Sequence, residues 1–243
     1  IDMTKEAEMD AMRSTFISNV SHELRTPVTV LRSYIDTLYN YGNEFDYDTQ
    51  KEFIGTINQE IIRLQGMVND ILDFSRMEAN AQMEKSLNSV YEVVDTCVSQ
   101  VQALTKERNL KITVTKDDGI PEFLFNYDGI GRALTNLLSN AIKYSPDNGE
   151  IKVNLTKTDN NAEITVTDQG CGIAPEFQKK IFDRFYRVEN NIHTVKGTGL
   201  GLHLVKQTIE KYHNGKVFVN SAVGQGSTFG IILPIKTIET ANI

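Results

Sequence analysis

The sequence predicts two domains, a helical hairpin that pairs into a dimeric four-helix bundle and an α+β domain with helices on one face of a sheet. Two observations lead to this fold class. Apolar residues recur at helical spacing before about residue 80, and short helices alternate with strands after it. We therefore expect the helical domain over residues 1–82 and the α+β domain over residues 83–243.

Helical periodicity runs over residues 4–39 and again over residues 48–79. In the second segment, apolar residues alternate at steps of four and three, as in coiled coils and helical bundles. Turn-forming residues over 41–46 predict an antiparallel hairpin, and Pro27 should kink or loosen its first helix. One hairpin buries too little apolar surface, so pairing of two copies in a homodimer is the simplest completion.

Shorter elements follow the hairpin. Apolar periodicity predicts helices over residues 89–108, 129–144 and 197–211. Two-residue alternation predicts strands over residues 111–115, 151–156, 162–167, 216–220 and 228–233. Turn signals such as Asp159-Asn160-Asn161 separate neighbouring strands. Helices mixed with hairpins favour a layer of helices on one face of the sheet.

The chain has 243 residues, 40% of them hydrophobic, and a net charge of −7. The acidic charge argues against binding of nucleic acid, which needs a basic surface. Cys97 and Cys171 lack metal-ligand spacing, so a reducing compartment is expected. No apolar run approaches the roughly 18 residues of a membrane span. Because the chain starts at Ile1, we expect it to be a cytoplasmic piece of a longer protein.

His22 lies in the stretch SHELRTP of the first predicted helix. It is two residues from both Val20 and Leu24 on the apolar seam, so at about 100° per residue it projects toward water. Glu23 is its neighbour, and Thr26 lies one turn along the same face. A lone histidine of this kind is usually an ordinary surface residue, and only these companions favour chemistry at the imidazole.

Asn136 and Asn140 share one face of the helix predicted over 129–144, and Lys143 and Tyr144 extend that face. An amide oxygen is an uncharged ligand suited to Mg²⁺, which also takes waters and substrate phosphates. A neighbouring lysine meets phosphate as a point charge. Taken alone, such a face is more often a polar helix surface than a metal site.

Asp168 directly follows a predicted strand and opens the stretch DQGCGI, which contains Gly170, Gly172 and Ile173. A carboxylate at the sheet edge beside unobstructed glycine backbone suits a planar base that offers an amino donor. A glycine-rich turn capped by the aspartate is an equally good interpretation of this segment by itself.

The stretch GTGLGL opens the last predicted helix and comprises Gly197, Thr198, Gly199, Leu200, Gly201 and Leu202. Glycines let backbone amides approach a phosphate, and a helix N-terminus adds its positive dipole. A loop precedes the stretch, so it is not a dinucleotide-binding fingerprint, and it lacks the Gly-Lys-Ser/Thr of a Walker A loop.

The segment between these two glycine-rich stretches is interpreted as a mobile lid. It begins with an aromatic hinge, FDRFYR, and continues with polar residues to Lys196. Arg187 offers a fork of donors that suits phosphate, although a solvated surface arginine is the default interpretation.

Together the motifs H-E-x-x-T-P, N-x-x-x-N, D-x-G-x-G, F-x-x-F and G-x-G-x-G resemble, in order and spacing, the cytoplasmic catalytic core of bacterial two-component sensor histidine kinases. The resemblance covers residues 16–234, and the run GQGSTF before the last strand fits it. Gln169 stands where many members have asparagine. Nothing expected of the catalytic set is missing.

This resemblance implies that the hairpin is the dimerisation and phosphotransfer domain, and that the second domain is an α/β sandwich of the gyrase, Hsp90 and histidine kinase type that binds ATP and Mg²⁺. His22 is then the phosphoacceptor, with Glu23 taking its other ring proton, and Thr26 orients the water that dephosphorylates the regulator. Asp168 meets the adenine amino group, and Asn140 binds Mg²⁺. The implied ATP site comprises Asn136, Asn140, Lys143, Tyr144, Asp168, Gly170, Gly172, Ile173, Arg187, Gly197, Thr198, Gly199, Leu200, Gly201 and Leu202.

The implied partners are a second copy of the chain and the receiver domain of a response regulator, without nucleic acid. A membrane is involved only through a missing N-terminal part of the parent protein. Two other functions stay open. One is an ATPase or serine kinase on the same nucleotide fold, which the His22 motif disfavours. The other is a nucleotide-sensing dimer that acts mainly as a phosphatase or scaffold.

Overall fold

The computed structural model describes residues 3–79, 82–106, 108–184, 186 and 199–236. The contacts between residues divide the chain into two compact units, with the division after Arg76. Within the described residues, every helix is too short or too polar to span a membrane.

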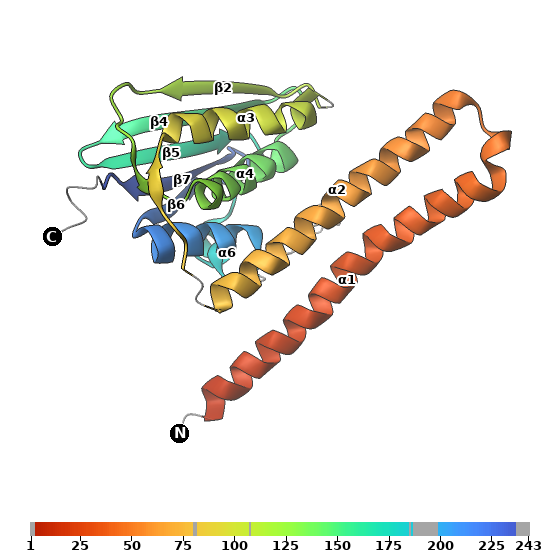
Figure 1. Ribbon diagram of the computed structural model, residues 1–243, viewed down its shortest axis with the longest axis horizontal. Coiled ribbons are helices and arrows are strands. Elements are labelled where there is room, and N and C mark those ends of the chain that lie inside the picture. Colours follow the sequence, from red (N-terminus) through yellow and green to blue (C-terminus); the bar gives the residue numbers. More distant parts are fainter. Residues whose placement is uncertain (1–2, 80–81, 107, 185, 187–198, 237–243) are drawn as a thin grey trace. The chain divides into compact units, whose positions relative to one another are not determined.

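The first unit is the predicted hairpin. Helix α1 (Met3–Tyr41) leads through a 3₁₀ turn (Gly42–Glu44) into helix α2 (Tyr47–Glu78), and the two helices run antiparallel (Figure 1). Asp46 caps the second helix, because its Oδ1 accepts the backbone N–H of Thr49 at 2.8 Å. Helix α1 continues through Pro27.

Aromatic side chains join the two helices near the turn. The ring of Phe53 on α2 packs edge-on against Tyr34 of α1, with ring centroids 5.1 Å apart, and against Phe45 at 5.3 Å. The predicted seam residues Leu24 and Leu31 are half-buried. The hairpin is therefore held by its apolar seam, as the spacing predicts.

The second unit is built on a five-stranded sheet of order β2-β4-β5-β7-β6. Its strands are β2 (Lys111–Lys116), β4 (Glu150–Thr158), β5 (Asn161–Asp168), β6 (Lys216–Ser221) and β7 (Ser227–Pro234). Only the β2–β4 pair is parallel. A small antiparallel pair, β1 (Ser86–Asn88) with β3 (Phe123–Phe125), stands apart from the sheet.

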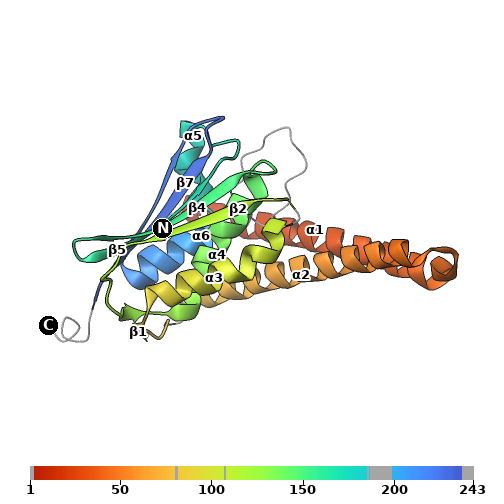
Figure 2. The ribbon, with the colours of Figure 1, turned by 90° about the horizontal axis from the view of Figure 1, so that it is seen from above.

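Helices α3 (Val90–Lys106), α4 (Tyr127–Tyr144) and α6 (Gly201–Lys206) cover one face of this sheet (Figures 1 and 2). The burial of β5 shows the same layering, since Ala162, Ile164 and Val166 are buried and the residues between them are only half-buried. This arrangement confirms the predicted α+β domain with one layer of helices.

The last predicted helix, over residues 197–211, differs from the observed one. Helix α6 begins at Gly201 and passes into a π-helical turn, Gln207–Tyr212, before β6. A further short helix, α5 (Pro175–Gln178), and a 3₁₀ turn (Lys180–Phe182) follow the loop after β5.

Candidate functional site

His22 is exposed on α1, as its position relative to the apolar seam predicts. Thr26 lies one turn further along, and its hydroxyl donates to the backbone carbonyl of His22 at 3.3 Å. The imidazole is thus open to solvent, with a hydroxyl one turn away on the same exposed surface.

Glu23 contacts the opposite helix of the hairpin. Its Oε2 lies 3.4 Å from a guanidinium nitrogen of Arg63 on α2, and the other terminal nitrogen of Arg63 lies 3.3 Å from Glu60. All three side chains are between 20% and 23% exposed. Sequence reasoning missed Arg63 and Glu60, although their separation of three residues marks them as neighbours on one helix face.

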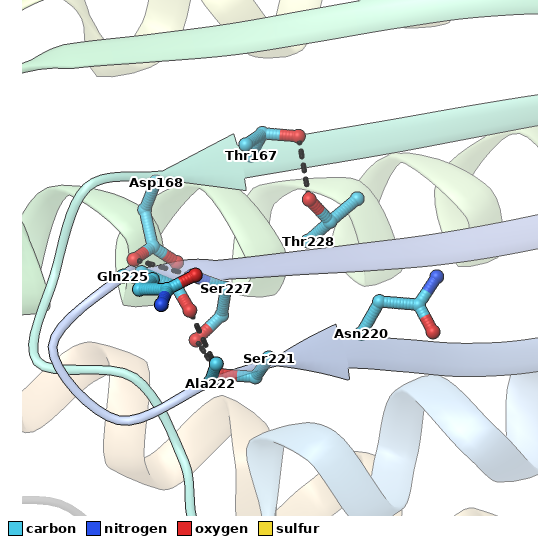
Figure 3. Close-up of a pocket in the computed structure, with 9 residues that line it drawn as sticks. Thr167, Asp168, Asn220, Ser221, Ala222, Gln225, Ser227 and Thr228 are labelled. Atoms are coloured by element: carbon cyan, nitrogen blue, oxygen red, sulfur yellow. Dashed lines mark hydrogen bonds between the residues drawn. The ribbon is translucent and has the colours of Figure 1, made fainter.

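Asp168 ends β5 on the helix-covered face of the sheet and is only 5% exposed. Its Oδ1 accepts the backbone N–H of Gly170 at 2.8 Å. It also accepts the backbone N–H of Ser227 at 3.2 Å (Figure 3). Burial raises the pKa of this carboxyl above its ordinary value, while the two N–H donors lower it. The aspartate therefore caps the glycine-rich turn and presents a buried acceptor.

Glycines bring the elements around Asp168 into close approach. A Cβ on Gly170 would lie 2.6 Å from the carbonyl oxygen of Tyr144, at the end of α4. A Cβ on Gly201, at the start of α6, would lie 2.8 Å from Oδ1 of Asn136. The loop after β5 and the start of α6 thus both border α4.

The C-terminal half of α4 carries the predicted polar face. Asn136, Asn140 and Lys143 are half-buried, and the Lys143 ammonium lies 5.5 Å from the centre of the Tyr144 ring. Arg108 caps the C-terminal end of this helix, since its guanidinium donates to the carbonyl of Ile142 in the last turn. The guanidinium of Arg108 donates to the carbonyl of Ser145 at 2.6 Å and pairs with Asp147 at 2.8 Å.

The donor set around Asn140 fits a magnesium ion brought with a nucleotide. No group of three or more His, Cys, Asp and Glu side chains forms a metal site within the described residues. Mg²⁺ commonly takes few protein ligands and completes its shell with substrate phosphates and waters. The half-buried Asn140 amide beside Lys143 suits that role.

Some predicted site residues lie outside the described residues, namely Arg187, Gly197, Thr198 and the lid segment 187–196. Of the others in the last glycine-rich stretch, Gly199 has a φ of +70° and Leu200 is fully buried. Gly172 has a φ of +71°, and a Cβ there would lie 1.9 Å from the carbonyl oxygen of Ala222. The absence of a side chain at Gly172 therefore permits contact with the β6–β7 turn.

A small hollow of about 200 Å³ lies at the ends of β5, β6 and β7. Its lining residues are Thr167, Asp168, Asn220, Ser221, Ala222, Gln225, Gly226, Ser227 and Thr228 (Figure 3). Of the predicted nucleotide residues only Asp168 lines it. Four other predicted residues, Asn136, Asn140, Lys143 and Tyr144, lie on α4 instead, and Gly170 and Gly201 approach this helix closely.

Two family models match the chain. The model described as "His Kinase A (phospho-acceptor) domain" matches residues 12–80, and that of the "Histidine kinase-, DNA gyrase B-, and HSP90-like ATPase" matches residues 125–237. Drug sensory protein A of Synechocystis sp. is 38% identical over 96% of this chain. The chain spans only 37% of that relative's length.

Solved structures show the same likeness. The mycobacterial sensor histidine kinase MprB is 32% identical, with a TM-score of 0.54, over 63% of this chain and 99% of that one. Histidine kinase ThkA in complex with response regulator protein TrrA aligns with 98% of this chain and 66% of that one at a TM-score of 0.70. Its identity is 24%, so this likeness concerns the fold.

Proposed function

Because the chain belongs to the sensor histidine kinase family, we propose that it transfers the γ-phosphoryl group of ATP to His22 and passes it on to an aspartate of a response regulator. One observation carries this proposal. A phospho-acceptor domain with an exposed histidine and an ATPase domain with a buried carboxylate at its sheet end occur in one chain. The boundary between the two domains is proposed near residue 82.

His22 supplies the nucleophile. Its Nε2 lone pair attacks the γ-phosphorus in line while the bond from that phosphorus to the bridging oxygen breaks, so the phosphoryl group moves to nitrogen and ADP leaves. Glu23 accepts the proton on the other ring nitrogen, which keeps Nε2 available for attack. The exposure of His22 supports this role, because a nucleotide held by another domain must reach the ring.

The second domain recognises the nucleotide. Asp168, held by the N–H groups of Gly170 and Ser227, accepts the adenine amino group. Asn140 is the proposed ligand of Mg²⁺, and Lys143 and Arg187 are the proposed phosphate contacts. A bound Mg²⁺ would neutralise negative charge on the phosphates.

A second copy of the chain completes the hairpin in this proposal. Val28 and Ile35 lie seven residues apart on α1 and are each 50% exposed. Ile54, Ile61 and Val68 lie at the same spacing on α2 and are between 41% and 58% exposed. Heptad-spaced apolar side chains are the surface that a helical bundle buries, so their exposure in one hairpin supports a dimeric four-helix bundle.

The partner that receives the phosphoryl group is proposed to be the receiver domain of a response regulator. The fold shared with ThkA, which was solved with the regulator protein TrrA, supports this choice. Thr26 is proposed to orient water for the reverse task, removal of phosphate from the regulator. An anchor in the bacterial membrane, outside this chain, completes the proposal for the parent protein.

Incubation with γ-labelled ATP tests the transfer. The wild-type protein should acquire a phosphoryl group that is labile in acid and stable in alkali, as phosphohistidine is. His22→Gln should abolish the label and leave nucleotide binding and dimerisation intact, because the exposed ring contributes little packing. Label on the variant at the wild-type level, or an acid-stable label on the wild type, would contradict the assignment.

A further inference from the structure

We propose that Ser221 is a positioning residue, which holds the Asp168 carboxylate in the arrangement that selects adenine; this inference rests on the ATP binding proposed above. Ser221 is the last residue of β6 and lies outside the motifs that identify the nucleotide site. It acts through two backbone segments, the loop 168–173 after β5 and the turn 222–226 between β6 and β7.

Strand pairing places Ser221 in line with Asp168. Ser221 pairs with Ser227 on β7, and Ser227 pairs with Asp168 on β5, so the three residues form a row across the sheet end. Alternate residues of a strand share a face, so this row lies on the same face as the buried Val166 and Phe229. That is the helix-covered face, where the predicted ATP site lies.

The Ser221 hydroxyl is fully used in hydrogen bonds. Its oxygen accepts the backbone N–H of Ile173 at 2.8 Å, and its proton is donated to the carbonyl of Gly226, also at 2.8 Å. The Ser227 hydroxyl lies 2.9 Å away and must donate, because Ser221 has only one proton to give. One side chain thus ties the loop after β5 to the β6–β7 turn, and Figure 3 shows the side of this tie that faces the turn.

The bond to Gly226 bears directly on Asp168. The carbonyl of Gly226 and the N–H of Ser227 belong to one planar peptide unit, so fixing the first fixes the direction of the second. That N–H donates to Oδ1 of Asp168 at 3.2 Å. Ser221 therefore orients one of the two backbone donors that hold the carboxylate.

Other bonds link the loop after β5 to the end of β6 and to the β6–β7 turn, and they should keep the fold intact without the hydroxyl. Gln178 Nε2 donates to the carbonyls of Ile173 at 3.0 Å and of Ser221 at 2.8 Å. The N–H of Gly224 donates to the carbonyl of Cys171 at 2.7 Å. Loss of the Ser221 hydroxyl should thus disturb the Asp168 carboxylate more than the stability of the domain.

The test compares ADP with inosine diphosphate, which lacks the exocyclic amino group, by titration calorimetry on the whole chain. Ser221→Ala should weaken ADP binding about tenfold, because it leaves buried polar groups unpaired near Asp168. Inosine diphosphate should bind with nearly unchanged affinity, so the ratio of the two affinities falls. If Ser221 had only a structural role, loss of its hydroxyl would weaken the binding of both ligands equally.

Thr228→Val is the matched control. Thr228 and Thr167 share a hydroxyl–hydroxyl bond of 2.9 Å in the next row of the same strands, on the opposite sheet face. This variant should keep the wild-type affinity ratio, and Ser221→Thr, which keeps a hydroxyl, should restore it. If Ser221→Ala does not fold, Ser221→Val is compared instead with Ser221→Thr, which has the same shape but keeps the hydroxyl.

The outcomes separate the two proposals. Equal losses for both ligands in Ser221→Ala, or a fall of the ratio in Thr228→Val, would overturn the role of Ser221 alone. A wild-type protein that binds ADP no better than inosine diphosphate would instead overturn the adenine recognition given to Asp168, and the role of Ser221 with it.

Discussion

The Arg63 guanidinium on α2 lies 3.4 Å from the carboxylate of Glu23 on α1, the residue that follows His22. The same guanidinium contacts Glu60, three residues earlier on its own helix, at 3.3 Å. One cation thus compensates two carboxylates, of which Glu23 directly follows the proposed phosphoacceptor His22 in the sequence. Because the incoming nucleotide is an anion, the charge of this group bears on the proposed reaction.

Arg63→Gln should slow labelling of His22 about two- to tenfold, since removal of the shared cation leaves more negative charge where ATP must approach. The loss should be largest at low ionic strength, because salt screens such repulsion. Initial rates of phosphorylation at several salt concentrations provide the measurement. The pair is partly exposed, so the stability of the hairpin should fall by only about 0.5–1 kcal/mol.

Glu60→Gln supplies the rescue for this prediction. In the Arg63→Gln background it removes one of the two carboxylates and returns the local charge to its original value, so labelling should recover in part. Arg76→Gln is the control, because Arg76 is an exposed arginine on the same helix that also pairs with a carboxylate three residues away, that of Asp73. A double variant as slow as Arg63→Gln at every salt concentration would refute the electrostatic explanation.

Asp168→Asn should weaken nucleotide binding without lowering the stability of the nucleotide-free domain. The folded protein raises the pKa of this carboxyl above the ordinary 3.8, so the charge carried at neutral pH opposes folding. Asparagine keeps an oxygen for the N–H donors of Gly170 and Ser227 but carries no charge. The nucleotide-free variant should melt at the same temperature as the wild type or a few degrees higher, since about 1 kcal/mol corresponds to roughly 2–4 °C.

Nucleotide binding should change in the opposite sense in this variant. The asparagine amide is a poorer acceptor for the adenine amino group, so ADP affinity should fall and the preference over inosine diphosphate should disappear. Thermal melting without nucleotide and calorimetry with it measure the two effects. A large drop in the melting temperature would show that the charge of Asp168 stabilises the domain.

The long elements could be predicted from the sequence because each shows a full apolar period. Helix α4 was expected over residues 129–144 and spans Tyr127–Tyr144, and β5 was expected over 162–167 and spans Asn161–Asp168. Strands β1 and β3 could not be predicted in this way. Each is three residues long, which is too short to show an alternating pattern.

The candidate site residues likewise fall into those with a local sequence pattern and those without one. Asp168 and Asn140 could be proposed from the sequence because they stand in local motifs with glycine or asparagine at fixed spacing. Ser221 and Arg63 could not, since their partners are distant in sequence: Ile173 lies 48 residues before Ser221, and Glu23 lies 40 residues before Arg63. Only strand pairing and hairpin packing bring these residues together, and neither leaves a local pattern.

His213 also bonds to a residue distant in sequence, and we expect it to make the stability of the second domain depend on pH. Its buried ring accepts the backbone N–H of Asn126 at 3.0 Å through Nε2, while Nδ1 donates to the carbonyl of Thr208 at 2.6 Å. Burial lowers the pKa of His213 below the ordinary 6.5, the bond to Thr208 raises it, and nearby Lys85 lowers it further. The neutral ring is the form that fits both bonds.

The unfolded chain takes up a proton at His213 near pH 6.5, whereas the folded protein takes it up only at a lower pH. The stability that the neutral ring contributes above pH 6.5 is therefore lost as the pH falls through the pKa of the folded protein. His213→Gln should lower stability by about 1–3 kcal/mol at pH 7.5, and the gap should narrow toward pH 5. Melting temperatures of both proteins across this range measure the gap. A constant gap would show that His213 does not titrate differently in the folded protein.

Thr26→Ala should spare the kinase and weaken the phosphatase. The Thr26 hydroxyl donates to the carbonyl of His22, but the attack of the His22 ring on ATP needs no hydroxyl one turn away. Attack of water on the regulator's acyl phosphate needs that water positioned, so loss of the hydroxyl should slow this step by one to two orders of magnitude, about 10–100-fold. Thr26→Ser, which keeps the hydroxyl, should retain most of the activity. Purified phosphorylated regulator mixed with each variant and ADP gives the rates, and equal rates for wild type and Thr26→Ala would leave Thr26 as an ordinary residue of the helix surface.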